Sequence, residues 1–377
     1  MKKAVTIAIP VFNSAVTIKR TLLSALNQTF PNIDYLIIDD KGTDGSLCRI
    51  NDIISSHPRG GDVRIIDHIV NKGIGATKNT AIDNADSEFL FFLDSDDVIT
   101  PDCIQKLYDA GKNKDCCYAS YMIFSSDMKH IGGHTLKRSF DRKAVPSLAH
   151  SLFWQGRCLY TPTWNKLYRV SFLQENHILC TPNTNVDDMF FTFQIAFHCK
   201  KFYTIPDVTY YYLLNNSSMT SGMGALRYDY ALQLTSACND MQRFLAANDS
   251  GELQWGYESM LCESVKWVVK KVLKSSILTE SQKEYLIQDR CDSLRRLGQS
   301  SRYNQALACL FFSDNYMDKA QEIIDFRTYT PVKKWQKDNM CFKARNMIVN
   351  AMSMFKYGLP KSYRTLAQTI AIGNDSN

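Results

Sequence analysis

Residues 89–101 read FLFFLDSDDVITP and join an apolar run to a cluster of carboxylates. The first five side chains are apolar, a pattern typical of a buried strand. Asp94, Asp96 and Asp97 follow within four positions. Like charges this close repel one another, and each is costly to remove from water unless a cation or a hydrogen-bond donor compensates it. The stretch predicts a strand whose carboxyl end meets positive charge.

The residues that follow disfavour two ordinary explanations for these carboxylates. Acidic residues before a helix most often cap it, but Thr100 and Pro101 are expected to take the cap and first helical positions of the next helix. An EF-hand loop would need an oxygen ligand where Val98 stands and a glycine where Ile99 stands. What remains is a loop at the carboxyl edge of a sheet, where open α/β folds bind ligands. A divalent metal and a phosphate ligand would balance its charge.

Around this stretch, short β-branched runs alternate with helical stretches, which is typical of βαβ units on a parallel sheet. Asn13 or Ser14 is placed to cap the first helix. In this amino-terminal part we expect strands at 5–9, 33–39, 63–69 and 88–93, and helices at 14–28, 43–57 and from about residue 74. Further along we expect helices at 166–176, 187–199, 263–276 and 319–326, and a strand at 207–214.

The chain has 377 residues, 45% of them hydrophobic, enough for one large α/β domain and a smaller one. The Ser/Gly-rich stretch SSMTSGMG predicts a boundary near residue 222, with a mostly helical region at 223–377. No apolar run approaches the roughly 18 to 20 residues of a membrane helix, and no signal-peptide pattern begins the chain. We therefore expect an unprocessed cytoplasmic protein, whose twelve cysteines, without zinc spacing, are reduced core residues.

The net charge of +6 lies mainly in the carboxyl-terminal part. Residues 1–220 hold 23 Lys and Arg against 22 Asp and Glu, whereas residues 221–377 hold 21 against 16. A basic tail favours an anionic partner. Residues 346–364 mix Met, Ile, Val and Phe with basic side chains, which suits peripheral contact with the inner membrane face as well as an ordinary packed helix with a solvated basic side. Nucleic acid is not the partner we expect.

Six segments, in order, resemble the family 2 glycosyltransferases of the GT-A fold. They are AIPVFN (8–13), LNQTFPNIDYLIIDDKGTDGS (26–46), NKGIGATKNTAIDNA (71–85), FLFFLDSDD (89–97), TWNKLYR (163–169) and NVDDMFF (185–191). The resemblance covers residues 4 to about 215. It implies a Rossmann-like mixed sheet flanked by helices. It also implies transfer of a sugar, with inversion, from a nucleotide diphosphate donor (UDP in the first instance) to a hydroxyl of a glycan or lipid-linked acceptor, assisted by Mn²⁺ or Mg²⁺.

The same resemblance assigns donor-binding residues. Asp96 would bind a metal that bridges both phosphates, Asp94 the ribose or metal-bound water, and Asp97 a neighbouring water or the donor sugar. Asp40 would accept the uracil imide N–H. Lys78 stands where relatives commonly carry Arg, so a point-charge contact with phosphate is expected in place of a bidentate one. The remaining donor-side residues are Pro10, Val11, Phe12, Asn13, Gly73, Ser95 and Lys166.

The segment NVDDMFF resembles the family's catalytic segment. Inversion needs a carboxylate that takes the acceptor hydroxyl proton while the oxygen attacks opposite the leaving diphosphate. Asp188 matches that base, and Asp187 replaces the usual Glu with a side chain one methylene shorter. An acidic pair favoured by the helix dipole is the structural alternative. Where relatives often carry Arg after the Tyr-rich strand, this chain has Leu213, so a diphosphate contact is expected only from Asn215, Ser217 or Ser218.

Two other functions compete with transfer. A dinucleotide-dependent oxidoreductase would carry three glycines, but Lys78 holds the place of the third. A non-catalytic nucleotide-sugar binding protein would not require both Asp96 and Asp188. The donor sugar, the acceptor and the oligomeric state are not encoded in these motifs.

Overall fold

A computed structural model describes residues 2–136, 140–143, 161–214, 226–248 and, between 261 and 287, all but 262, 263, 266, 269 and 270. All of these belong to one compact unit, Met1–Leu297, and the second unit, Gly298–Asn377, lies outside the described residues. The boundary expected near residue 222 also falls outside them and stays an expectation.

The described residues form a ten-stranded mixed sheet in the order β3-β2-β1-β4-β9-β6-β10-β5, with β7 beside β6 and β8 beside β10. The first four strands of this order are parallel, whereas β9 runs antiparallel to both β4 and β6. The strands are β1 (Val5–Val11), β2 (Ile33–Asp39), β3 (Val63–Asp67), β4 (Phe89–Phe92), β5 (Val98–Ile99), β6 (Cys116–Phe124), β7 (His130–His134), β8 (Phe140–Lys143), β9 (Lys166–Arg169) and β10 (Lys201–Leu213).

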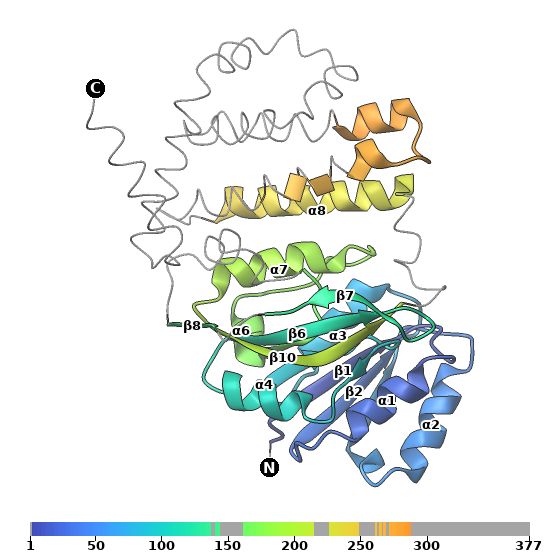
Figure 1. Ribbon diagram of the computed structural model, residues 1–377, viewed down its shortest axis with the longest axis vertical. Helices are drawn as coiled ribbons and strands as arrows, with labels where there is room; N and C mark the ends of the chain where they lie inside the picture. Colours follow the sequence, from blue (N-terminus) through green and yellow to red (C-terminus); the bar gives the residue numbers. More distant parts are fainter. Residues whose placement is uncertain are drawn as a thin grey trace. The chain divides into compact units, whose positions relative to one another are not determined.

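Helices cover both faces of the sheet (Figure 1). The helix α7 packs against α3 on one face and carries α8 on its outer side, while α1 and α2 contact each other on the opposite face. The helices are α1 (Ile18–Leu26), α2 (Ser46–Ser56), the short η1 (Gly60–Asp62), α3 (Ile74–Asp83), α4 (Cys103–Gly111), α6 (Val170–Glu175), α7 (Asp187–His198) and α8 (Tyr228–Ala247).

The core lies where β1 and β4 meet. Every residue of both strands is buried, as expected of continuous apolar runs covered on two faces. The helix α1 buries Ile18, Leu22 and Leu26, spaced as one helical face. The mixed sheet with flanking helices confirms the predicted fold class, and the strands expected near β1 to β4 are present with shifts at their ends.

Three local predictions were wrong. Residues 166–176 were expected to be one helix, but Lys166–Arg169 form β9, because this segment pairs with both β4 and β6 before α6 begins. Neither Asn13 nor Ser14 caps α1: the helix begins at Ile18, and only the backbone carbonyl of Ser14 takes part, accepting the N–H of Ile18 at 2.9 Å.

The third error concerns Thr100, which does not cap α4. That helix begins at Cys103 with Asp102 at the cap position, and Thr100 donates its hydroxyl to Asp102 at 2.8 Å. The conclusion drawn from that cap nevertheless holds, because the acidic cluster occupies a loop between β4 and β5 and caps no helix.

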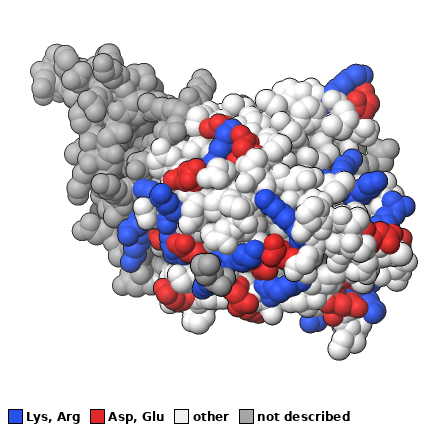
Figure 2. Space-filling view, turned by 90° about the horizontal axis from the view of Figure 1, so that it is seen from below, with Lys and Arg blue, Asp and Glu red and all other residues white. Residues whose placement is uncertain are grey.

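Beyond α8, the described residues at 271–274 and 280–287 are helical, in keeping with the expectation for this region. The predicted helix at 319–326 and the basic segment 346–364 lie outside the described residues. No helix in the described part of the chain is both long enough and apolar enough to cross a membrane. Figure 2 shows basic and acidic side chains interspersed on the face in view, so the charge there is mixed.

Candidate active site

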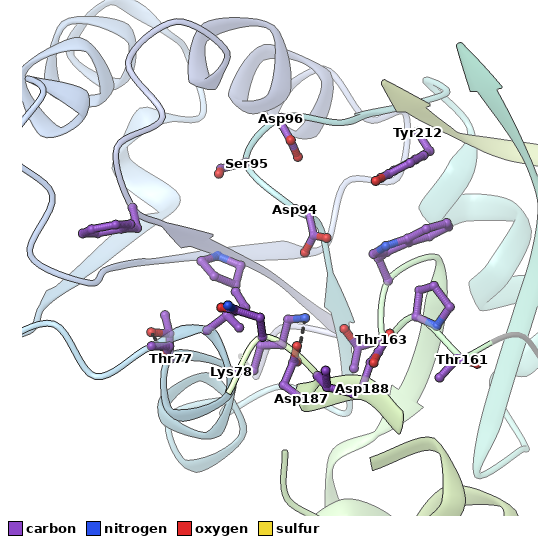
Figure 3. A pocket seen from close by; sticks show the side chains of 18 of the residues that line it. Thr77, Lys78, Asp94, Ser95, Asp96, Thr161, Thr163, Asp187, Asp188 and Tyr212 are labelled. Carbon is purple, nitrogen blue, oxygen red and sulfur yellow. Dashed lines mark hydrogen bonds and ion pairs between the residues drawn. The ribbon is translucent and has the colours of Figure 1, made fainter. Parts of the chain in front are cut away.

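A cavity of about 1110 Å³ opens at the carboxyl ends of β1 and β4. Apart from Asp97 and Lys166, the residues assigned above to the donor, the metal and the base line it: Pro10, Val11, Phe12, Asn13, Asp40, Gly73, Lys78, Asp94, Ser95, Asp96, Asp187 and Asp188. Figure 3 shows the acidic loop after β4 on one side and the acidic start of α7 on the other. Residues from five separate segments thus share one cavity, at the edge where open α/β sheets bind ligands.

The acidic loop after β4 divides its carboxylates between two tasks. Asp97 is fully buried, and its two oxygens accept the hydroxyl of Tyr210 at 2.7 Å and the N–H of Leu213 at 2.8 Å. This side chain therefore fastens the loop to β10. It does not line the cavity, where the resemblance placed it against a water or the donor sugar. Asp94 and Asp96 line the cavity instead.

Asp94 is the unsatisfied member of this loop. Its Oδ1 is buried and has no hydrogen-bond partner among the described residues. Burial raises the pKa of Asp94 to about 6, with Lys78 lowering it and Asp96 raising it further. A buried carboxylate oxygen without a donor is the environment that a cation would relieve. No group of three or more metal-binding side chains occurs in the described residues, so such a cation would need ligand oxygens from a substrate.

The backbone of the acidic loop is held by α1 and the turn before it. The carbonyl of Ser95 accepts the hydroxyl of Thr17 at 2.9 Å, and the carbonyl of Asp97 accepts that of Thr21 at 2.8 Å. Arg20 donates to the carbonyl of Asp96 at 2.8 Å. These contacts leave the carboxylates of Asp94 and Asp96 facing the cavity. These contacts could not be predicted from the sequence, because hydroxyls on a helix carry no signal of a distant partner.

Asp40 fixes the loop that leads into α3. Its carboxylate accepts the N–H groups of Lys72 and Gly73, both at 2.8 Å, and lies 2.7 Å from Nδ1 of the buried His68. Each carboxylate oxygen has about two acceptor positions, so one remains on Oδ2 for a ligand. The predicted contact with a uracil imide therefore stays a prediction that this geometry permits.

The glycines of the same loop have conformational and packing duties. Gly73 has a φ of 81°, in the left-handed region that favours glycine, and this turn brings its N–H to Asp40. A Cβ on Gly75 would come within 2.0 Å of the carbonyl oxygen of Thr181. The glycine at 75 thus lets α3 approach the segment that precedes α7.

The start of α7 carries the second acidic pair. Asp187 is buried and forms an ion pair with Nζ of Lys78 at 2.9 Å, drawn as a dashed line in Figure 3. Burial lowers the pKa of Lys78, but the charges of Asp187 and Asp94 raise it by more. The ammonium of Lys78 has Asp187 as its direct partner, and its expected contact with phosphate stays a prediction.

Asp188 is placed differently from Asp187. Burial raises its pKa to about 6; Asp187 raises it further, while Lys78 and then Lys166 lower it. Burial lowers the pKa of Lys166 to about 7, and its Nζ donates to the carbonyl of Pro162. Lys166 is not among the residues that line the cavity, and the donor contact predicted for it stays a prediction.

Aromatic rings form the wall beside Asp94. The indole of Trp164 stacks on Tyr210 with ring centroids 4.4 Å apart and on Tyr212 at 5.7 Å. Asn165 supports this turn, donating to the carbonyls of Ala119 and Ser120 at 3.0 Å. Trp164, Tyr121 and Tyr212 all line the cavity. Of these three, only Trp164 belongs to a segment that carries the family resemblance.

Comparisons with known proteins agree with this geometry. Residues 6–176 match the model of the glycosyl transferase family 2. Residues 6–176 form a family 2 glycosyltransferase domain. Its mixed sheet and helices are those of the GT-A fold, as predicted.

Two curated relatives of this glycosyltransferase domain come from bacilli. The chain is 31% identical over 221 residues to the glycosyltransferase EpsH of Bacillus subtilis, covering 57% of this chain and 62% of that protein. It is 33% identical over 214 residues to the poly(ribitol-phosphate) beta-glucosyltransferase of Bacillus spizizenii, covering 56% of this chain and 32% of that protein. The matches thus span less than two thirds of the length of either relative.

Solved structures support the fold of the glycosyltransferase domain. Residues 1–349 of S. aureus TarS, crystallised in complex with UDP-GlcNAc, superpose with a TM-score of 0.61 at 18% identity, covering 90% of this chain and 92% of that one. The mannosyltransferase PcManGT from Pyrobaculum calidifontis, in complex with GDP-Man and Mn²⁺, gives a TM-score of 0.50 at 14% identity, covering 89% and 85%.

Proposed function

We propose that this protein is an inverting glycosyltransferase that moves a hexose or N-acetylhexosamine from a UDP-sugar to a hydroxyl group of a cell-surface polymer. The observation that carries the proposal is the pairing of two different carboxylate environments across one cavity. Asp94 has an unsatisfied buried oxygen on one side, and Asp188 has a pKa raised to about 6 on the other. The environment of Asp94 suits the diphosphate end of a donor, and that of Asp188 suits a general base.

The nucleotide would lie along the end of β1. Phe12 is half exposed and lines the cavity, so its ring is free to stack on a base, and Asp40 retains an acceptor position for an imide N–H. UDP is the nucleotide in the TarS complex, whereas the PcManGT complex contains GDP-Man. The acceptor position on Asp40 favours uracil, which offers one imide N–H.

Asp94 and Asp96 are the residues that would hold Mn²⁺ or Mg²⁺. The orphaned Oδ1 of Asp94 and the hard oxygen character of both carboxylates fit such an ion, with diphosphate oxygens completing its ligands. When bound, the ion neutralises the negative charge that grows on the departing diphosphate. The crystallised PcManGT complex contains Mn²⁺, which supports the same assignment here.

Asp188 would act as the general base. Its carboxylate accepts the proton of the acceptor hydroxyl as that oxygen bonds to the anomeric carbon. The bond between that carbon and the diphosphate oxygen breaks, and its electron pair leaves with UDP. A pKa of about 6 keeps most of the carboxylate ionised at neutral pH while leaving it more basic than an ordinary Asp. Asp187, tied to Lys78, would orient the pair.

The acceptor class rests on the relatives. The Bacillus spizizenii relative glucosylates poly(ribitol phosphate) by name, and TarS of S. aureus, 25% identical over 210 residues, is named for adding N-acetylglucosamine to it. We therefore expect a polyol-phosphate or glycan polymer as acceptor. A non-catalytic nucleotide-sugar binding protein remains the competing function, and turnover separates the two.

Donor hydrolysis tests the proposal without a known acceptor. The full chain is incubated with Mn²⁺ and, separately, UDP-glucose, UDP-GlcNAc, GDP-mannose and dTDP-glucose, and released sugar is measured. We expect slow hydrolysis of one or both UDP-sugars, reduced to background by EDTA. Tight UDP-sugar binding without any released sugar, on this donor panel or with polymer present, would indicate a non-catalytic binding protein instead.

A further inference from the structure

The helix α8 follows the segment matched by the family model and still contributes to the cavity. Tyr230 and Leu234 of α8 line it, four positions apart and hence on one helical face. Ser264 and Trp267, further along the chain, line it as well. Of these, Tyr230 lies close enough to Asp188 and Asp187 for their charges to raise its pKa. This cavity is therefore incomplete without residues that lie beyond the matched segment.

Side-chain contacts fix α8 to α7 and to the residues just before it. The amide oxygen of Gln233 accepts the hydroxyl of Thr184 at 3.1 Å and the N–H of Asn185 at 2.8 Å. These two residues precede the acidic pair with only Val186 between them, and Asn185 lines the cavity. The ring of Phe244 on α8 packs against Phe190, 5.7 Å between centroids, and Phe197, 5.0 Å. The relation between α8 and Asp188 is thus set by specific contacts.

We infer that α8 forms the acceptor side of the site and that the hydroxyl of Tyr230 contacts the acceptor beside Asp188. The inference rests on the proposed function and assigns Tyr230 to substrate contact and Gln233 to positioning.

Two observations support this assignment. The donor-side features, Phe12, Asp40 and Asp94, come from the ends of β1, β2 and β4, so an acceptor must approach from the α7 side. There Thr163 also lines the cavity, and its buried hydroxyl has no hydrogen-bond partner among the described residues. Polar hydroxyls next to aromatic surface suit a polyol or sugar, which presents hydroxyl groups on an apolar carbon frame.

The chemistry of Tyr230 suits a hydrogen-bond donor. Burial raises its pKa, and the charges of Asp188 and Asp187 raise it further, so the phenol stays protonated at neutral pH. Its hydroxyl can then donate to one acceptor oxygen while Asp188 receives a proton from another. Leu234 and Trp267 would pack against the carbon frame of the same molecule.

The test measures how the enzyme divides the donor between acceptor and water. Wild type and Tyr230→Phe are given UDP-glucose or UDP-GlcNAc with Mn²⁺, and either poly(ribitol phosphate) or glycerol as the acceptor probe. Glycoside and free sugar are quantified together. Loss of one hydrogen bond should lower the glycoside-to-sugar ratio by about 3- to 10-fold while UDP affinity changes by less than about 2-fold.

Tyr228→Phe is the matched control, because Tyr228 belongs to the same helix but does not line the cavity. Its ratio should equal that of the wild type. An unchanged ratio in Tyr230→Phe, or an equal fall of transfer, hydrolysis and UDP affinity, would overturn the contact. If the wild type releases no sugar and forms no glycoside from any donor, the proposed function fails instead, which keeps the two failures distinct.

Gln233 gives a second measurement. Gln233→Leu removes the acceptor of both loop contacts, so transfer and hydrolysis should fall together by about 10-fold, with UDP affinity retained. Gln233→Glu keeps an oxygen that can accept both bonds and should restore most of the rate. If Gln233→Glu is as slow as Gln233→Leu at equal thermal stability, the positioning role is wrong.

Discussion

The loop after β4 and the first turn of α7 each pair an anchored carboxylate with one that faces the cavity, but their anchors differ in charge. Asp97 is held by neutral donors, the hydroxyl of Tyr210 and the N–H of Leu213. Asp187 is held by the ammonium of Lys78. Neutral anchors add no positive charge, so the β4 loop still needs a cation. The α7 turn has one built in, which suits it to proton transfer.

The two regions are also coupled through a single residue. Lys78 lowers the pKa of Asp94 and of Asp188 against the opposing effect of burial. Its position between the pairs means that the metal-binding and base-forming sides share one compensating charge. Four changes test this comparison, beginning with the one expected to have the largest effect.

The largest effect is expected from Asp188→Asn. Loss of a general base typically costs about 10² to 10⁴ in rate, whereas donor affinity should stay nearly intact because a base acts in the transition state. Transfer rates and UDP affinity are measured for Asp188→Asn and, as the matched change, Asp187→Asn. A larger rate loss for Asp187→Asn would assign the base to the other carboxylate.

Asp96→Ala should abolish the metal dependence of nucleotide binding. Removing one of two protein ligands should weaken Mn²⁺-dependent UDP binding by about 10- to 100-fold. Calorimetry with UDP in Mn²⁺ and in EDTA measures this, and Asp86→Ala, an exposed acidic change, is the control. Equal UDP affinity of the wild type in Mn²⁺ and in EDTA would show that nucleotide binding at the β4 loop does not use a metal.

Lys78→Met should move the pH profile. In the wild type, kcat/KM should rise with pH through about 6, because Asp188 must lose its proton to act as a base. Without the ammonium, the pKa of Asp188 rises, and the acidic limb should shift upward by about 1 pH unit. Lys72→Met, an exposed change nearby, should leave the profile in place. An unchanged pH profile in Lys78→Met would show that Lys78 does not couple the two regions electrostatically.

The smallest functional effect is expected from Tyr210→Phe. It leaves one oxygen of buried Asp97 without its donor, which should lower the free energy of unfolding by about 1 to 3 kcal/mol. UDP affinity should change little, since Asp97 does not line the cavity. Chemical denaturation and calorimetry compare it with Tyr211→Phe on the same strand. A loss of UDP affinity without a loss of stability would give Asp97 a role in ligand binding.

Much of the fold was predictable because β1, β2 and β4 are mostly apolar runs whose burial does not depend on distant detail. The strand at Lys166–Arg169 was not predictable. The residues that follow it in sequence give the segment a helical pattern, and only pairing with β4 and β6 makes it a strand. The cap positions at the starts of α1 and α4 were misplaced for a related reason, because the turns before them are shaped by contacts with other loops.

The candidate site follows the same division. Residues at strand ends, such as Asp40 and Asp94, could be placed at one edge because the topology brings strand ends together. The contacts of Asp97 and Lys78 could not be predicted, since each is set by a partner far along the chain. Tyr230 and Gln233 were missed because they lie beyond the segments that carried the resemblance, and a lone Tyr or Gln on a helix has no motif.

The contacts that hold the site carboxylates close long loops. Lys78 and Asp187 are 109 residues apart in sequence, and Asp97 is 113 residues from Tyr210 and 116 from Leu213. Ordering such loops costs chain entropy before the contacts repay it, so high separation slows folding. During synthesis, the acidic loop therefore waits for β10 to leave the ribosome before Asp97 has a partner. Catalytic activity would report the completion of this unit, and truncated chains ending before Tyr210 would lack both donors to Asp97.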